Sequence, residues 1–418
     1  MCKIKRIVID NFRGIEHMEV DCSNRLNVFI GANGAGKSSV LEVVRLFESW
    51  FVARMRSANG RGAVLQSSDI MVGKDYCKVQ ILLDNGEECT LFKKANLIRR
   101  NFDLKSDVKA MGCLADALIE HRNQDNTFPF PIVAYYGVNR AITDISLRPK
   151  EKPKLEATDA YYGSVDGSAC IKQFFSWFRE QEDIENDEFR YNQSAFQPNR
   201  QLEAVREAIR NILPGYSNLR VSRKPLCLML EKESVKLRFN QLSDGEKCYI
   251  TLVADIARRM AMTAGSRNVM GGGVVMIDEV ELHLHPLWQR EVLSKLVSTF
   301  PNCQFFITTH SPLVLSEVNR NENDVFVPMI DGRACPYSHS TYGMTFTDIL
   351  TSVFDVPSTH NSVIQSHIDA VWKMLNEGDC SSTNYQNEMR WLQANLDAND
   401  TEFFHIRMEE LKLKRDKR

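Results

Sequence analysis

The 418-residue sequence lacks the long apolar runs that mark membrane-spanning or secreted chains. It holds no stretch of about 18 consecutive apolar residues. The N-terminus, MCKIKRIVIDNFRG, carries charges where a signal peptide has its apolar region. We therefore expect a cytoplasmic protein with no membrane partner.

Paired cysteines and a one-sided charge are also missing. The eleven cysteines stand singly, with no CxxC pair, which is typical of reduced thiols rather than of disulfides or a zinc site. The 52 Lys+Arg nearly balance the 54 Asp+Glu, so composition favours neither a general nucleic-acid binder nor a membrane-surface protein. Nucleic acid stays open as a partner through local basic clusters, namely Arg54/Arg56/Arg61, Lys93/Lys94/Arg99/Arg100 and the C-terminal KLKRDKR.

What the chain does have is an alternation of short β-branched runs with amphipathic helical segments. Such alternation indicates a parallel sheet with crossover helices. Two extended runs within 77–93 flank Asn85-Gly86, and this predicts a hairpin with a type I′ turn. The expected strands include 3–9, 26–31, 131–140, 219–239, 274–277 and 303–309, and the expected helices follow Gly36 and cover 201–215, 244–264 and 286–300.

The segment 31–38, GANGAGKS, fits the phosphate-loop pattern GxxxxGK[ST] between an expected strand and an expected helix. Its glycines let the backbone curl so that N–H groups and the helix N-terminus point at a phosphate. Lys37 would hold the β- and γ-phosphates of ATP, and the Ser38 hydroxyl would bind Mg²⁺. The candidate phosphate-binding residues are Gly31, Asn33, Gly34, Ala35, Gly36, Lys37, Ser38 and Ser39.

Polar residues follow two further buried strands. The run 274–277 leads into Asp278-Glu279, where Asp278 would support Mg²⁺ and Glu279 would polarise an attacking water. His310 follows the strand 303–309, and strand ends of a parallel sheet share one crevice, so it is a candidate to face the γ-phosphate. No third metal ligand accompanies His283 and His285, so we expect them to serve in packing or in an interface rather than to bind a metal.

The segment Leu242 to Lys247, LSDGEK, opens an expected helix with Ser243 as its N-cap. In this order of motifs it resembles the signature LSGGQ of ABC-type ATPases. The opening IDNFRG (9–14) resembles that of RecF, SMC and OLD-like ATPases. The segments 132–140, 242–261 and 273–318 are similar to the ATPase subunit of Septu-type antiphage systems, the PtuA-like family.

The resemblance implies an α/β fold, an ABC-ATPase head with a phosphate loop, a mixed or parallel sheet, an antiparallel subdomain, a helical insertion and C-terminal helices. Its expected parts are a first lobe (1–140), the insertion (141–215), a second lobe with the signature (216–345) and a helical tail (346–418). Ser243 and Gly245 would reach the γ-phosphate held by a second subunit, so a homodimer or higher oligomer is expected. The expected cofactors are ATP and Mg²⁺, and the expected partner is a separately encoded effector nuclease, suspected to be of the HNH type.

A RecF- or SMC-like DNA-binding repair ATPase is the alternative function. The sequence shows no sustained heptads, so a long coiled-coil arm is not expected, and residues 346–418 are too few for the Toprim nuclease of OLD proteins. Asp244 stands where the signature usually has glycine, and His285 where many transporters have aspartate. The glutamine-containing loop of the family has two candidates, Gln66 and the YYGVNR segment.

Overall fold

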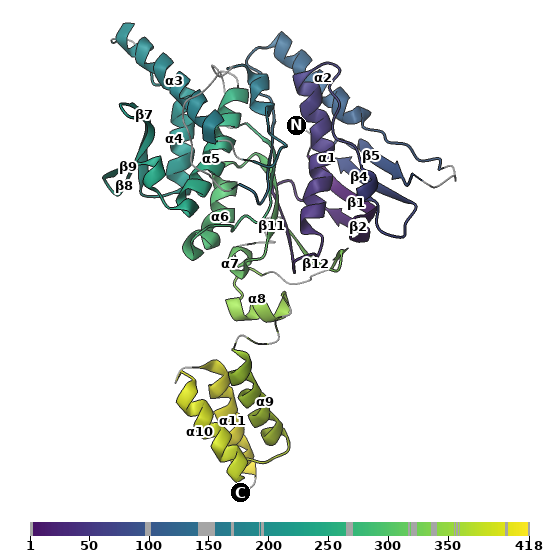
Figure 1. The fold of residues 1–418 in the computed structure, drawn as a ribbon, viewed down its shortest axis with the longest axis vertical. Coiled ribbons are helices and arrows are strands. Elements are labelled where there is room, and N and C mark those ends of the chain that lie inside the picture. The colour runs from purple at the N-terminus through teal and green to yellow at the C-terminus, as the bar shows by residue number, and fades with distance from the viewer. Residues whose placement is uncertain are drawn as a thin grey trace. The chain divides into compact units, whose positions relative to one another are not determined.

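The computed structural model describes residues 3–96, 102–140, 155–168, 171–191, 193, 196–264, 271–316, 318, 324–335, 341–354, 356, 358, 360–397 and 400–416. The basic residues Arg99 and Arg100, the insertion segment 141–154 and the last two residues of the tail lie outside these ranges. The chain forms two compact units, Met1–Phe346 and Thr347–Arg418 (Figure 1). No helix in the described part combines the length and the apolar character that a bilayer crossing requires.

A six-stranded sheet in the order β13-β12-β3-β11-β10-β6 forms the centre of the first unit. Neighbouring strands among β12, β3, β11, β10 and β6 pair in parallel, and β13 pairs antiparallel to β12. Every residue of β10 and β11 is buried, as parallel strands covered on both faces require. The strands are β3 (Leu26–Gly31), β6 (Ile132–Tyr136), β10 (Gly273–Ile277), β11 (Cys303–Thr309), β12 (Val325–Ile330) and β13 (Arg333–Ala334).

A separate antiparallel sheet in the order β2-β1-β4-β5 lies on the other side of helix α1 (Figure 1). Its strands are β1 (Ile4–Phe12), β2 (Ile15–Asp21), β4 (Tyr76–Leu83) and β5 (Glu88–Lys94), and the helices beside it are α1 (Lys37–Arg56) and α2 (Lys109–Gln124). One hydrophobic core joins α1, α2 and both sheets through residues such as Ile7, Val43, Val79 and Val274. The expected α/β class is confirmed.

The hairpin around Asn85-Gly86 is present, but the predicted type I′ turn is wrong. A type I′ turn needs positive φ at two central residues, and of this pair only Gly86 has it, at 87°. The Gly86 N–H donates to Leu83 O over 3.0 Å, and the Leu83 N–H donates to Glu87 O over 2.9 Å. The connection is therefore a three-residue loop that ends in a left-handed glycine, the next most common hairpin connection.

Helices and a small third sheet fill the chain between β6 and β10. Helices α3 (Ile171–Tyr191) and α4 (Arg200–Ile212) precede the antiparallel strands β7 (Tyr216–Arg223), β8 (Leu226–Lys232) and β9 (Val235–Arg238). Leu202, Val205 and Ile209 are buried at helical spacing, so α4 packs on α5 (Asp244–Thr263) and β7. Helix α6 (Pro286–Thr299) follows β10, and the single turns η1 (Ser67–Asp69), η2 (Ala157–Tyr161), η3 (Phe239–Gln241) and α7 (Pro312–Leu315) complete this unit.

The second unit, Thr347–Arg418, is helical. Helix α8 (Phe346–Ser352) spans the boundary between the units, and α9 (Ser362–Asn376), α10 (Thr383–Asn395) and α11 (Thr401–Asp416) follow. Their buried residues, among them Val371, Leu392 and Ile406, form one small core. Each of α9 and α10 begins at a side-chain cap, Asn361 and Ser382 respectively.

Candidate functional site

The loop 31–36 connects β3 at the centre of the sheet to the N-terminus of α1. Its last residue, Gly36, is the N-cap of α1 and has a φ of 97°, a left-handed conformation that favours glycine. No side chain caps this helix and its first turn has no acidic residue. The backbone N–H groups at the start of α1 are therefore available to an anion, with the helix dipole in support.

Lys37 lies beneath this loop and is almost entirely buried. Its Nζ donates to Gly31 O and to Ala32 O, each over 3.0 Å. Burial lowers the pKa of Lys37, and the nearby Glu279 and Asp278 carboxylates oppose that shift. The lysine therefore has a cationic end held among the loop carbonyls and the acidic pair.

Asp278 and Ser38 meet at the C-terminal edge of the central sheet, as the motifs predict. The Ser38 hydroxyl donates to Asp278 Oδ1 over 3.1 Å, although 240 residues separate the two. The Thr308 hydroxyl of β11 donates to the same carboxylate oxygen. It also accepts from the Glu279 N–H over 2.8 Å, so Thr308 fixes both acidic residues.

Glu279 and His310 lie side by side. Glu279 has a φ of 48°, a left-handed conformation that is strained for a glutamate and that is found mostly at functional sites. His310 Nε2 lies 3.9 Å from Glu279 Oε1, and both side chains are partly exposed. The His310 N–H donates to the Glu281 carboxylate, which sets the position of this backbone.

Arg140 is a site residue that the sequence reasoning missed. Its buried guanidinium donates to the carbonyl oxygens of Asp278 and Glu279, and to Gly137 O over 3.3 Å. The signal was an arginine four residues after the end of a buried strand, in the YYGVNR segment. The other candidate for the glutamine loop, Gln66, donates its amide to Val64 O instead.

Ser243 caps α5 through a capping box with Glu246. The Ser243 hydroxyl donates to Glu246 Oε2 over 2.8 Å and accepts from the Glu246 N–H over 3.3 Å. Lys232 Nζ of β8 donates to Glu246 Oε1 over 2.6 Å, and the Tyr216 hydroxyl of β7 donates to it as well. Burial would raise the pKa of Glu246, but the hydrogen bonds from Lys232, Tyr216 and Ser243 outweigh it and lower the pKa to about 2.

Gly245 is required by a close approach of two backbones. A Cβ at this position would lie 2.2 Å from His283 O, in the turn that follows the acidic pair. Nearby, His285 is the N-cap of α6, where its Nδ1 accepts from the Leu287 N–H over 3.3 Å. Among the described residues, no hydrogen bond or ion pair links Ser243 or Gly245 to the loop 31–39. Within the described part of the chain the signature segment and the phosphate loop therefore share no polar contact.

Comparison with protein families agrees with this geometry. A profile of the family described as "AAA ATPase domain" matches residues 2–218, more than half of the chain. The chain belongs to this family. A second AAA-domain profile, whose description includes a Type IV TA system, matches residues 139–316 of this ATPase. The protein is therefore an ATPase that binds nucleotide.

Three curated relatives are similar over most of their length. The Retron Vc95 probable ATPase of Vibrio cholerae serotype O1 biovar El Tor is 28% identical, over 91% of this ATPase and 85% of the relative. The Retron Ec83 probable ATPase of Escherichia coli is 29% identical over 76% and 70%, respectively. The Septu protein PtuA of Bacillus thuringiensis is 24% identical over 90% of both chains. The resemblance to the PtuA-like family is confirmed.

Proposed function

We propose that this ATPase is an ATP-dependent switch of antiphage defence. In this role it associates around ATP, as a homodimer or higher oligomer, and controls a separately encoded effector nuclease. The observation that carries the proposal is that Lys37, Ser38, Asp278 and Glu279 converge, whereas Ser243 shares no hydrogen bond or ion pair with the phosphate loop among the described residues. We call these two groups the half-sites. The similarity to Septu and retron proteins supports the defence setting.

The phosphate-loop half would bind and hydrolyse ATP. Residues 31–39 would hold the phosphates, and Ser38 and Asp278, whose oxygens lie 3.1 Å apart, offer the hard oxygen donors that Mg²⁺ prefers. Bound Mg²⁺ would neutralise charge on the phosphate oxygens. Glu279 would accept hydrogen bonds from the attacking water, and His310, 3.9 Å from it, would face the γ-phosphate.

The signature half would act on the nucleotide of a second subunit. Ser243 and the N–H groups at the start of α5 would bind the γ-phosphate that the partner's loop holds. Gly245 would allow the close packing of this helix start against the backbone at His283. ATP would then be part of the interface, and its hydrolysis would remove the shared contact. Residues 1–140 and 216–345 would serve as the two lobes of this head, 141–215 as an insertion and 346–418 as a tail.

The effector would be a nuclease, and we propose the HNH type because of the similarity to Septu PtuA. The cysteines of the described residues are all free, which supports a cytoplasmic setting. Two of the basic residues that could bind DNA already have partners within the chain. Arg54 forms an ion pair with Asp116 over 2.6 Å, and Arg56 lies over the Tyr162 ring. This weakens the alternative of a DNA-binding repair ATPase.

Light scattering of the purified full chain tests the proposal. With ATP, Glu279→Gln should accumulate as a dimer or larger assembly, and the co-expressed nuclease encoded beside it should copurify. Lys37→Ala should stay at the mass of the ATP-free protein. Intact protein that fails to bind ATP would contradict the proposal, and ATP-dependent, salt-sensitive binding of duplex DNA by this chain alone would favour the repair ATPase.

A further inference from the structure

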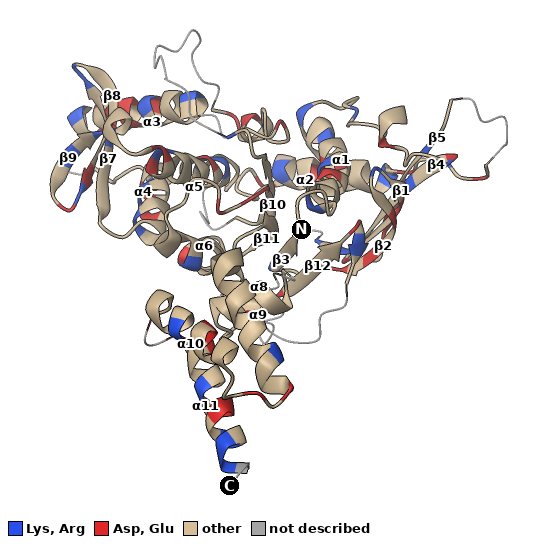
Figure 2. Ribbon diagram, turned by 60° about the horizontal axis from the view of Figure 1, so that its bottom comes forward, with Lys and Arg blue, Asp and Glu red and all other residues tan. Residues whose placement is uncertain are grey.

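A cavity of about 410 Å³ opens between helix α4 and the β7-β8-β9 sheet, and none of the residues proposed for nucleotide lines it. Its size is within the range of pockets that take small ligands. In the ribbon of Figure 2, both basic and acidic positions are coloured on these elements. The residues that line the cavity are Glu203, Arg206, Arg210, Asn218, Leu219, Arg220, Glu231 and Lys236. Four of them are basic and two are acidic.

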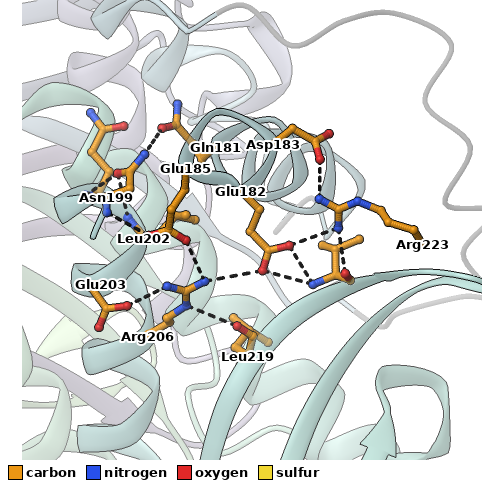
Figure 3. A network of polar contacts seen from close by, with 12 residues as sticks. Gln181, Glu182, Asp183, Glu185, Asn199, Leu202, Glu203, Arg206, Leu219 and Arg223 are labelled. Carbon is orange, nitrogen blue, oxygen red and sulfur yellow. Dashed lines mark hydrogen bonds and ion pairs between the residues drawn. The ribbon is translucent and has the colours of Figure 1, made fainter. Parts of the chain in front are cut away.

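Arg206 lines the cavity, but its charge is already used in ion pairs within the protein. Its guanidinium lies among Glu182, Glu185 and Glu203, at 3.5, 3.5 and 2.6 Å, as Figure 3 shows. The side chain is only 19% exposed. Glu182 also accepts from Arg223 of β7 over 3.1 Å, so the same network ties α3, α4 and β7 together. Arg206 is therefore shared among three carboxylates and neutralises Glu203 only in part.

The other acidic residue of the cavity, Glu231, already accepts a hydrogen bond from the Asn218 amide over 2.5 Å. Lys236 is opposite Glu231 in the β8–β9 register, yet no ion pair joins them within the described residues. Glu203 is thus shared between Arg206 and Arg210, and Glu231 has a neutral amide as its partner. Their charge reduces the positive potential of the cavity but does not cancel it.

Three cations from three elements remain at the cavity. Arg210 of α4 is half exposed and lies 3.8 Å from the nearest carboxylate oxygen, that of Glu203. Arg220 of β7 and Lys236 of β9 are exposed, and neither has an ion pair with a carboxylate of the described chain. Arg210 therefore has one long ion pair, whereas Arg220 and Lys236 have none among the described residues. Cations that line one cavity repel one another, and an anion between them lowers that cost.

We propose that this cavity binds a phosphate-bearing ligand. Two guanidinium groups offer planar forks that match the oxygens of a phosphate, and Lys236 adds a point charge. The shared chemistry is that of a phosphate group, whether on a free small molecule or in a nucleic-acid backbone. The site lies outside the residues proposed for ATP, so it stands independently of the proposed switch.

The test uses the full chain carrying Lys37→Ala, so that the phosphate loop does not compete for the probe. Calorimetry with inorganic pyrophosphate and fluorescence anisotropy with a 20-nucleotide labelled single strand would measure binding at fixed salt. Arg220→Ala combined with Lys236→Ala should weaken binding of whichever probe binds by at least tenfold, since two charged contacts are removed. Both positions are exposed, and an unchanged melting temperature would verify the fold.

Lys172→Ala is the matched control, because Lys172 is an exposed lysine of α3 that does not line the cavity. It should change binding less than twofold. Binding of pyrophosphate would support a free phosphate ligand, and binding of the strand alone, with a salt dependence that the double variant reduces, would support a backbone ligand. Failure of both probes to bind, or equal binding by the double variant and the control, would overturn the proposal.

Discussion

Helices α1 and α5 are each 20 residues long and each begins at one half-site, but their N-termini differ. The start of α1 has a glycine cap and no acidic side chain, so its N–H groups are open to an external anion. The start of α5 already holds its own anion, because Glu246 bonds back to Ser243 and Asp244 lies beside it. The N-terminus of α1 is therefore suited to bind phosphate directly. The N-terminus of α5 is suited to a contact that forms only when a phosphate competes with its own glutamate.

The largest expected effect concerns the phosphate-loop half. Glu279→Gln should lower ATP hydrolysis by about 10²- to 10⁴-fold, the range for loss of a general base, while ATP still binds. Release of phosphate under saturating ATP measures this. Glu281→Gln is the control, since Glu281 bonds the His310 backbone and should matter less. Equal losses in both variants would contradict the role of Glu279.

Each helix has a lysine in its first turn, and replacing these two lysines should change the affinity for ATP to different extents. Lys37→Ala should weaken ATP binding about a hundredfold, because charge-assisted contacts to two phosphates are lost. Lys247→Ala should weaken it less than threefold, since Lys247 bonds only Asp244, over 3.1 Å. Calorimetric titration with ATP would compare them. Similar affinities in the two variants would mean that the half-sites are assigned wrongly.

The helices also differ in the charge of a buried glutamate. Burial raises the pKa of Glu48 on α1 to about 8, whereas hydrogen bonds lower that of Glu246 on α5 to about 2 despite its burial. Unfolded glutamate titrates near 4.5, so the stability that protonated Glu48 provides is full below that pH and falls towards pH 8. The slope is at most about 1.4 kcal/mol per pH unit. The contribution of Glu246 has the opposite sign: it is full above 4.5 and is lost as pH falls towards 2.

Urea unfolding between pH 3 and pH 8 would test how the contributions of Glu48 and Glu246 to stability change with pH. Glu48→Gln should flatten the decline on the alkaline side and leave the acid side unchanged. Glu246→Gln should do the reverse. A Glu48→Gln variant with the wild-type slope between pH 5 and pH 8 would show that Glu48 is ionised in the folded protein.

Removing the cap of α5 should affect association more than stability. Ser243→Ala should cost about 1 kcal/mol of folding free energy, as cap losses do, and weaken ATP-dependent association about tenfold. Ser382→Ala, which removes the serine cap of α10, should cost similar stability without changing association. Mass photometry with ATP would read the difference. Equal association of both variants would exclude a role of Ser243 at the interface.

The smallest effect is expected at Asp244, whose side chain is 87% exposed. Asp244→Asn removes a negative charge from the signature and should strengthen ATP-dependent association a few-fold, more at low salt than at high salt. The same light-scattering assay would measure it. A weaker association would show that the aspartate contributes a favourable contact.

Much of this site could be predicted because it depends on local patterns. The loop 31–38 and the pair Asp278-Glu279 follow apolar runs, and parallel strands bring their ends to one edge, so their meeting follows from topology. Arg140 was missed although it lies in the YYGVNR segment, because no motif indicates that its guanidinium bonds the backbone carbonyls of Asp278 and Glu279. Strand β12 was missed because Pro328 interrupts its pattern, although it pairs with β3 along its length.

The capping box of α5 has a consequence for the proton of one hydroxyl group. Ser243 has a single O–H, and it is donated to Glu246 Oε2 over 2.8 Å. Phosphate oxygens are acceptors as well, so Ser243 can donate to a γ-phosphate only after its hydroxyl turns away from Glu246. The exchange gives up one hydrogen bond to a carboxylate, about 1.5–3 kcal/mol, against one gained to phosphate. A contact with so small a net gain forms and breaks readily, as reversible pairing of subunits requires.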